Sequence, residues 1–156
     1  MSLTSAEPRL TEKEGKYLVF VYRNQHELSG RVKTTSLANA FGVRPATVTE
    51  MLQKLAEKGL LKYTPYHGIE LTGEGIAEAR SLLRKHRLLE VLFVSALNCD
   101  IRSACGEASR LDYHVSEELV DDISRTYGHP RTCPCNKPIF SDRGRVGGYR
   151  RGTEGR

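Results

Sequence analysis

The four cysteines of this chain are the side chains best suited to chemistry, and all of them follow residue 98. They form two pairs that flank one short helical segment: Cys99 and Cys105 before it, and Cys133 and Cys135, two apart in a loop that contains proline, after it. Cysteines two apart do not easily form a disulfide, but both can ligate one metal centre. The chain opens with no secretion signal, which favours metal or redox use over structural disulfides. The pattern predicts one shared metal or cluster site, with four unrelated buried thiols as the alternative.

A second candidate for metal binding is the pair His86 and Glu90, which are four residues apart on a predicted helix. The pair interrupts an apolar stripe, where polar groups cost free energy unless they have partners, so a metal ligand is a natural explanation. A hydrogen-bonded pair at a dimer interface is the alternative, and it is the better one for the pair taken alone. Glu107 begins a further polar cluster, which suits either a divalent metal or a solvated helix face. Its other members are Ser109, Asp112 and His114.

The sequence shows no nucleophile–base arrangement, phosphate-binding loop or carboxylate pair of the kind that catalysis needs. A redox enzyme that uses Cys133 and Cys135 would need a thioredoxin-like βαβ pattern, which the sequence lacks. We therefore predict that the protein is not an enzyme.

The elements that would position these residues begin with a helix-turn-helix at residues 35–48, whose second helix continues to residue 58. Ala38 is small where the two helices must approach, and Gly42 can adopt the positive φ that ends a helix and reverses the chain. Pro45 stands near the start of the second helix, where its missing N–H costs nothing. The pattern is typical of a motif whose second helix enters the DNA major groove.

Two short apolar strands, residues 60–64 and 69–71, follow this motif around a turn and predict the wing of a winged helix. The first turn and outer face of the recognition helix, together with the wing tip, are expected to contact DNA through charged, hydroxyl-bearing and small side chains. These residues are Arg44, Pro45, Ala46, Thr47, Thr49, Glu50, Lys54, Tyr66 and His67.

The remaining pattern predicts a mainly α protein of three parts: a winged-helix DNA-binding domain at 1–72, a helical domain at 73–140 and a basic tail at 141–156. Thr11 caps a first helix, and residues 26–33 read as a polar loop. The helical domain should contain helices near 73–97, 102–111 and 117–127. Their broad apolar face is too large for so few helices to cover, so we expect a homodimer that reads an inverted repeat in double-stranded DNA.

Charge adds little to this argument. The net charge is +5, but the first 128 residues hold equal numbers of basic and acidic side chains, so the whole excess follows His129. The Gly/Arg-rich tail is expected to be mobile unless a partner orders it, and to add phosphate contacts. No apolar run approaches a membrane span, so a cytoplasmic location and no membrane partner are expected.

Several of these segments together resemble the metal-dependent repressors related to the diphtheria toxin repressor and the manganese transport regulator. The resemblance covers roughly residues 11–139 and implies dimerisation after the wing and DNA binding switched by Fe²⁺ or Mn²⁺. The chain is similar to the short members, which lack an SH3-like domain. The marks besides the winged helix are Lys85-His-Arg-Leu-Leu-Glu90, Glu107-Ala-Ser-Arg-Leu-Asp-Tyr-His-Val-Ser116 and Cys133-Pro-Cys-Asn-Lys-Pro-Ile139.

Carried over by position, the resemblance implies that His86 and Glu90 are ligands of an ancillary metal site, with Cys105 as a third ligand and Glu107 beside them. The primary site departs from the family pattern. Its first-helix ligands fall on Lys16 and Val19, which cannot bind a divalent ion, and its later ligands fall on Ser109, Asp112 and Tyr113.

The four cysteines offer a replacement for the primary site. We therefore predict a dimeric transcription regulator that senses iron, metal or redox state through an iron–sulfur cluster or Zn²⁺ at Cys99, Cys105, Cys133 and Cys135. Fe²⁺ or Mn²⁺ at the ancillary-type site is the alternative cofactor. The alternative function is a winged-helix protein-interaction module with a structural zinc and no operator.

Overall fold

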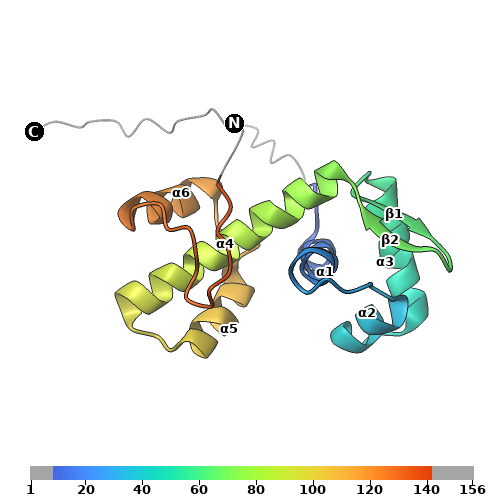
Figure 1. Cartoon of the computed structure of the whole chain (residues 1–156), viewed down its shortest axis with the longest axis horizontal. Coiled ribbons are helices and arrows are strands. Elements are labelled where there is room, and N and C mark those ends of the chain that lie inside the picture. Colours follow the sequence, from blue (N-terminus) through green and yellow to red (C-terminus); the bar gives the residue numbers. More distant parts are fainter. Residues whose placement is uncertain (1–8, 142–156) are drawn as a thin grey trace, which may run out of the picture. The chain divides into compact units, whose positions relative to one another are not determined.

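The computed structural model describes residues 9–141, and the chain forms two compact units that divide between Leu82 and Leu83. The fold is mainly helical with one two-stranded sheet, as predicted (Figure 1). The sequence-based boundary at 72/73 precedes the longest helix, whereas the structural division falls inside it. In chain order the elements are α1 (Glu12–Tyr22), η1 (Arg23–Glu27), α2 (Thr34–Phe41), α3 (Pro45–Glu57), β1 (Leu61–Thr64), β2 (Gly68–Leu71), α4 (Gly73–Leu97), α5 (Ile101–Leu111) and α6 (Glu117–Thr126).

The predicted helix-turn-helix is formed by α2 and α3 in the first unit. Gly42 ends α2 with φ +62°, and its N–H donates to the carbonyls of Ala38 and Asn39. Ala38 is buried, as its predicted place between the helices requires. The inner face of α3, which includes Val48, is fully buried, so its other face is free for recognition.

The predicted wing is the antiparallel hairpin of β1 and β2. Thr72 joins this hairpin to α4: its N–H donates to the Leu60 carbonyl at 3.1 Å, and its hydroxyl donates to the Gly59 carbonyl at 2.7 Å. At Gly75, a Cβ would overlap the carbonyl oxygen of Leu60, so the close approach requires glycine. The first turn of α4 is therefore fixed against the start of the wing.

A capping box begins α1, as the sequence predicts. The Glu14 N–H donates to the Thr11 hydroxyl at 3.2 Å, and the Thr11 N–H donates to Glu14 Oε2 at 2.9 Å. Glu14 is buried, and Oε2 also accepts from Lys58 Nζ at 2.6 Å. Burial acts to raise the pKa of Glu14, but the bonds from Lys58 and Thr11 outweigh it and hold the pKa below its ordinary value of 4.5.

The prediction that a polar loop begins at His26 is wrong by two residues, because the chain continues as the π-helical turn η1. The Leu28 N–H donates to the Arg23 carbonyl at 3.0 Å, which closes the wider turn. The His26 ring stacks on Tyr22 with centroids 4.7 Å apart, a contact that holds His26 against the end of α1.

The second unit packs α5 and α6 against the C-terminal part of α4 (Figure 1). Its core joins Leu88 and Leu89 of α4 to Ala108 of α5 and to Val120 and Ile123 of α6. The helix predicted near 102–111 begins at Ile101, because Asp100 caps it. Several large apolar side chains in this unit remain between 42% and 66% exposed: Leu97, Ile101, Leu111 and Leu119.

The predicted basic tail, residues 141–156, lies outside the described residues apart from Ser141, so its role stays a prediction. Within residues 9–141, no helix combines the length and the apolar character that crossing a bilayer requires. The cytoplasmic location also stays a prediction.

Candidate metal centre and nucleic-acid interface

The buried carboxylate of Glu90, on α4, is the centre of the candidate metal site. Glu90 is 2% exposed. Its Oε1 lies 2.8 Å from His86 Nε2 and 3.8 Å from Cys135 Sγ. Its Oε2 is buried and has no hydrogen-bond partner among the described residues. A buried charged oxygen without a partner is costly, so this oxygen has the capacity to bind a cation.

His86 is held from both sides. Its Nδ1 lies 3.1 Å from Asp112 Oδ2, and its Nε2 lies 3.5 Å from Cys105 Sγ as well as close to Glu90. Burial acts to lower the pKa of His86, but the bonds with Asp112 and Glu90 outweigh it and raise the pKa to about 9. Asp112 therefore contacts the ring nitrogen that faces away from Glu90, and a carboxylate in this place orients the imidazole of a histidine that binds a metal. The family resemblance implied instead that Asp112 belongs to the primary site.

Cys133 and Cys135 are presented by a tight hairpin after α6. The Cys133 N–H donates to the Lys137 carbonyl at 2.9 Å, and the Asn136 N–H donates to the Cys133 carbonyl at 2.8 Å. Burial raises the pKa of the Cys133 thiol, and the nearby Glu90 carboxylate acts in the same direction, whereas the N–H groups of Lys137 and Cys135 act to lower it. Backbone donors directed at a buried sulfur favour a thiolate when a metal is present to receive it.

Arg87 connects this hairpin to α4. The side chain is 2% exposed, and its Nη1 donates to the Pro138 carbonyl at 2.7 Å. The guanidinium carbon also lies 5.6 Å from the centroid of the Phe140 ring. A buried arginine on α4 thus fixes the end of the loop whose thiols face Glu90.

These contacts produce two ligand groups that share Glu90: one with His86 and Cys105, the other with Cys133 and Cys135. Within each group, the ligand atoms lie within 4.8 Å of one another. Together they offer one imidazole nitrogen, one carboxylate and three thiols. This set suits Zn²⁺ or Fe²⁺ better than Mn²⁺, which prefers oxygen ligands. The unpartnered Oε2 of Glu90 also fits a bound cation.

Two predicted ligands belong to neither group within residues 9–141. Cys99 follows the end of α4, where its N–H donates to the Phe93 carbonyl at 3.2 Å. Glu107 is exposed, and its carboxylate lies 3.6 Å from Arg110 Nη1. The structure thus brings three of the four cysteines to one carboxylate, and the four-cysteine centre stays a prediction.

The positions of the family's first-helix ligands carry no ligand chemistry here. Lys16 is exposed, and its ammonium lies 3.4 Å from the carboxylate of Glu12 on the preceding turn of α1. Val19 is hydrocarbon and half-buried. The first helix therefore offers no replacement for the missing primary-site ligands at these two positions.

The predicted DNA-contacting residues lie on the exposed surface of the first unit, opposite the buried face of α3. All are exposed except Thr47 and Thr49, which are half-buried. The Thr49 hydroxyl donates to the Pro45 carbonyl at 3.2 Å, so only its lone pairs remain for a partner. Tyr66 and His67 occupy the wing tip, where Tyr66 has φ +66°. Contact with DNA through these residues stays a prediction.

Sequence reasoning missed a basic cleft beside the wing. This cleft, of about 610 Å³, is lined by Arg31 and Lys33 from the segment before α2 and by His67 from the wing, and no acidic side chain is among the described residues that line it. Gln25 Nε2 donates to the Ile69 carbonyl at 2.7 Å and so ties the two walls together. The sequence feature that could have indicated this cleft is the pair of basic residues just before the helix-turn-helix.

Fold and site together define a winged-helix regulator with a helical metal-binding unit, and comparison with known proteins agrees. Residues 9–69 match the family described as iron dependent repressor, N-terminal DNA binding domain. Residues 72–141 match the iron dependent repressor, metal binding and dimerisation domain. The chain therefore belongs to the iron-dependent repressor family. Its members are transcriptional regulators rather than enzymes, which confirms the resemblance seen in the sequence.

Individual relatives support this assignment. An uncharacterised HTH-type transcriptional regulator of Methanocaldococcus jannaschii is 37% identical over 107 residues, which are 69% of this chain and 86% of that protein. The HTH-type transcriptional regulator MntR of Lysinibacillus sphaericus is 32% identical over 61% of this chain and 68% of its own length.

Solved structures show the same fold. A manganese-dependent transcriptional repressor in complex with manganese matches with a TM-score of 0.77 and 32% identity, over 86% of this chain and 62% of that one. ScaR with bound Zn²⁺ matches with a TM-score of 0.71 and 31% identity, over 82% of this chain and 59% of that one.

Proposed function

We propose that this regulator is a dimer that binds an inverted repeat with an affinity set by a thiophilic divalent cation, Zn²⁺ or Fe²⁺, at the Glu90 centre. The observation that carries the proposal is the buried Oε2 of Glu90, which has no partner among residues 9–141 although three thiols and an imidazole surround the carboxylate. A cation there would satisfy that oxygen and compensate the negative charge of bound thiolates.

The donor set supports the choice of metal. Glu90, His86 and Cys105 would hold the ion from α4 and α5, and Cys133 and Cys135 from the hairpin. When bound, the ion supplies positive charge and fixed coordination geometry, which join the hairpin to the helices. A relative is described in complex with manganese, but three thiols here favour a softer ion.

The DNA side of the proposal rests on the exposed face of α3, the wing tip and the basic cleft. Arg44 and Lys54 can donate to guanine or phosphate, and Ala46 can contact a thymine methyl group. Arg31 and Lys33 would contact the backbone beside the wing. A two-fold dimer presents two such surfaces, which calls for an inverted repeat.

Metal analysis of protein purified without oxygen tests the metal site. We expect close to one Zn²⁺ or Fe²⁺ per chain and no sulfide. The Cys133→Ser, Cys135→Ser double variant should lower the affinity, measured by chelator competition, at least 100-fold. Cys99→Ser is the matched control and should bind as tightly as the wild type. Metal-free protein with four freely titrating thiols would contradict the site.

The same variants decide between a single ion and the predicted iron–sulfur cluster. A brown protein with visible charge-transfer absorption and stoichiometric sulfide would indicate a cluster. In that case Cys99→Ser should abolish the colour, because a four-cysteine cluster needs all four thiolates.

Selection of bound fragments from random DNA, with and without added Zn²⁺ or Fe²⁺, tests the regulatory half of the proposal. We expect an inverted repeat to be enriched, and the enrichment to depend on the metal. Equal enrichment with and without metal would leave the DNA-binding function intact but remove the metal as its signal. An asymmetric single site would remove the proposed symmetric mode of binding.

A further inference from the structure

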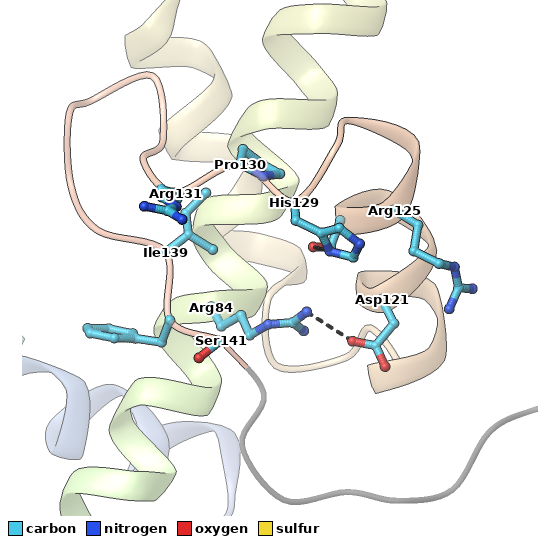
Figure 2. Close-up of a pocket in the computed structure, with 10 residues that line it drawn as sticks. Arg84, Asp121, Arg125, His129, Pro130, Arg131, Ile139 and Ser141 are labelled. Atoms are coloured by element: carbon cyan, nitrogen blue, oxygen red, sulfur yellow. Dashed lines mark hydrogen bonds and ion pairs between the residues drawn. The ribbon is translucent and has the colours of Figure 1, made fainter.

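A separate cavity of about 500 Å³ lies in the second unit, beside α4, α6 and the loop that follows α6 (Figure 2). Its volume falls in the range of small-molecule sites. None of the five residues of the Glu90 centre lines it. The lining instead combines basic side chains with a small apolar wall formed by Pro130, Ile139 and Phe140.

Arg84, on α4, is the buried basic group of this cavity, with 8% of its surface exposed. Its Nη2 pairs with Asp121 Oδ1 at 3.0 Å. Its Nη1 is buried and has no hydrogen-bond partner among the described residues. A guanidinium has five N–H donors, and a buried donor left unpaired is costly. One carboxylate therefore leaves part of this group's donor capacity unused.

His129 adds a second donor group next to Arg84. Its backbone has φ +53°, and its N–H donates to the Ser124 carbonyl at 2.7 Å. Its Nδ1 lies 3.1 Å from the Ser124 hydroxyl. Figure 2 shows the His129 ring and the Arg84 guanidinium turned toward the same space between α4 and α6. A ligand in this space would meet both groups.

The remaining lining fits an anion better than a cation. Arg125 and Arg131 also belong to the lining, which includes three arginines and a single aspartate. Of these, Arg125 is paired with Asp122 on α6. At the end of α6, the N–H groups of residues 127–129 donate to the carbonyls of Ile123, Ser124 and Arg125. The apolar wall would accept a hydrocarbon portion of the same ligand.

The geometry points to a binding site for a small amphipathic oxyanion, a phosphate- or carboxylate-bearing molecule. Its anionic group lies against Arg84 and His129, and its apolar part lies against Ile139 and Phe140. The site and the metal centre share no side chain.

Calorimetric titration of the full chain at constant ionic strength tests this site with phenyl phosphate, benzoate and inorganic phosphate as probes. We expect one of the two aromatic anions to bind at least tenfold more tightly than inorganic phosphate, and the stronger of the two identifies the preferred anionic group. Heat from none of the probes, or equal affinity for all three, would overturn the proposal.

Variants locate the binding. Arg84→Gln should weaken the stronger probe at least tenfold, whereas Arg110→Gln, which removes an exposed arginine from α5, should change affinity less than twofold. Because Arg84 is buried and its loss can unfold the unit, His129→Ala provides a second test and should weaken the probe at least fivefold. Wild-type affinity in folded His129→Ala and Arg84→Gln proteins would place the probe elsewhere.

Discussion

The recognition helix α3 and the Glu90 centre use polar side chains in opposite ways. On α3 and at its N-cap, Arg44, Glu50 and Lys54 are exposed, and the framework beneath them is apolar. At the centre, His86 and Glu90 are largely buried and already contact one another. Exposed polar groups are available to a binding partner and contribute little to the free energy of folding. Buried polar groups must instead be hydrogen-bonded or paired inside the protein, because their burial otherwise costs free energy. Variants should therefore separate affinity from stability on α3 but combine them at the metal centre.

The largest effect is expected where the first turn of α4 packs against the start of the wing. Gly75→Ala would place a Cβ against the Leu60 carbonyl, so we expect a loss of about 3 kcal/mol or more in the free energy of unfolding. Gly73→Ala is the matched control, because a Cβ there meets nothing within 4 Å, and it should be neutral or slightly stabilising. Thermal denaturation of the two variants is the measurement, and equal melting temperatures would contradict the packing argument.

The next largest effect is expected from a residue that contacts a metal ligand without being one of the ligands. Asp112→Asn keeps the size of the side chain but removes the charge beside His86 Nδ1. We expect metal affinity to fall about 10–100-fold in chelator competition. Asp122→Asn on α6 is the control and should bind metal like the wild type. If Asp112→Asn also does so, the imidazole is oriented without help from Asp112.

Among the exposed residues of α3, Lys54 tests the contact with DNA. Lys54→Ala should weaken operator binding by about 1–3 kcal/mol if the side chain contacts a base edge. Its melting temperature and metal affinity should remain those of the wild type, because Lys54 is exposed. Lys13→Ala on α1 serves as the control at the same salt concentration. A change in the stability of Lys54→Ala would break the distinction between the two regions.

The smallest effect concerns Glu14, a buried carboxylate of the first unit. Its Oε2 accepts from Lys58, whereas Oε2 of Glu90 has no such bond among the described residues. Because folding lowers the pKa of Glu14 below 4.5, its contribution is present above pH 4.5 and is lost as the pH falls through the folded-state value. Glu14→Gln should cost about 1 kcal/mol at neutral pH.

Denaturation at several pH values measures this contribution. The difference between the wild type and Glu14→Gln should shrink as the solution becomes more acidic than pH 4.5. A difference that is constant with pH would mean that the carboxylate charge contributes nothing to stability.

Features that depend on residues close together in the chain were predicted from the sequence, and features that depend on distant residues were not. The capping box at Thr11, the turn at Gly42 and the wing depend on neighbours within a few residues, so spacing and residue type were sufficient. The π-helical turn is closed by the bond from the Leu28 N–H to the Arg23 carbonyl, and no residue type or periodicity in the sequence marks such a turn. This is why the loop was predicted to begin too early.

The metal centre was predictable in its residue types but not in its membership. Cys135 lies 45 residues from Glu90 in the chain, and their contact depends on the hairpin after α6. Cys99 has the same chemistry, yet it follows the end of α4 and lies outside both ligand groups. Residue type suggested four equivalent thiols, whereas tertiary packing selected three of them.

Apolar side chains remain partly exposed at the end of α4 and on α5 and α6. Their presence makes the free energy of unfolding depend on the protein concentration. The chain carries its family's dimerisation domain, so covering such side chains in a dimer couples unfolding to dissociation. By mass action, each tenfold dilution then removes about 1.4 kcal/mol per dimer from the free energy that separates the folded dimer from unfolded chains. Melting temperatures taken at calorimetric concentrations will therefore overstate the stability of the same protein at the dilution of a DNA-binding assay.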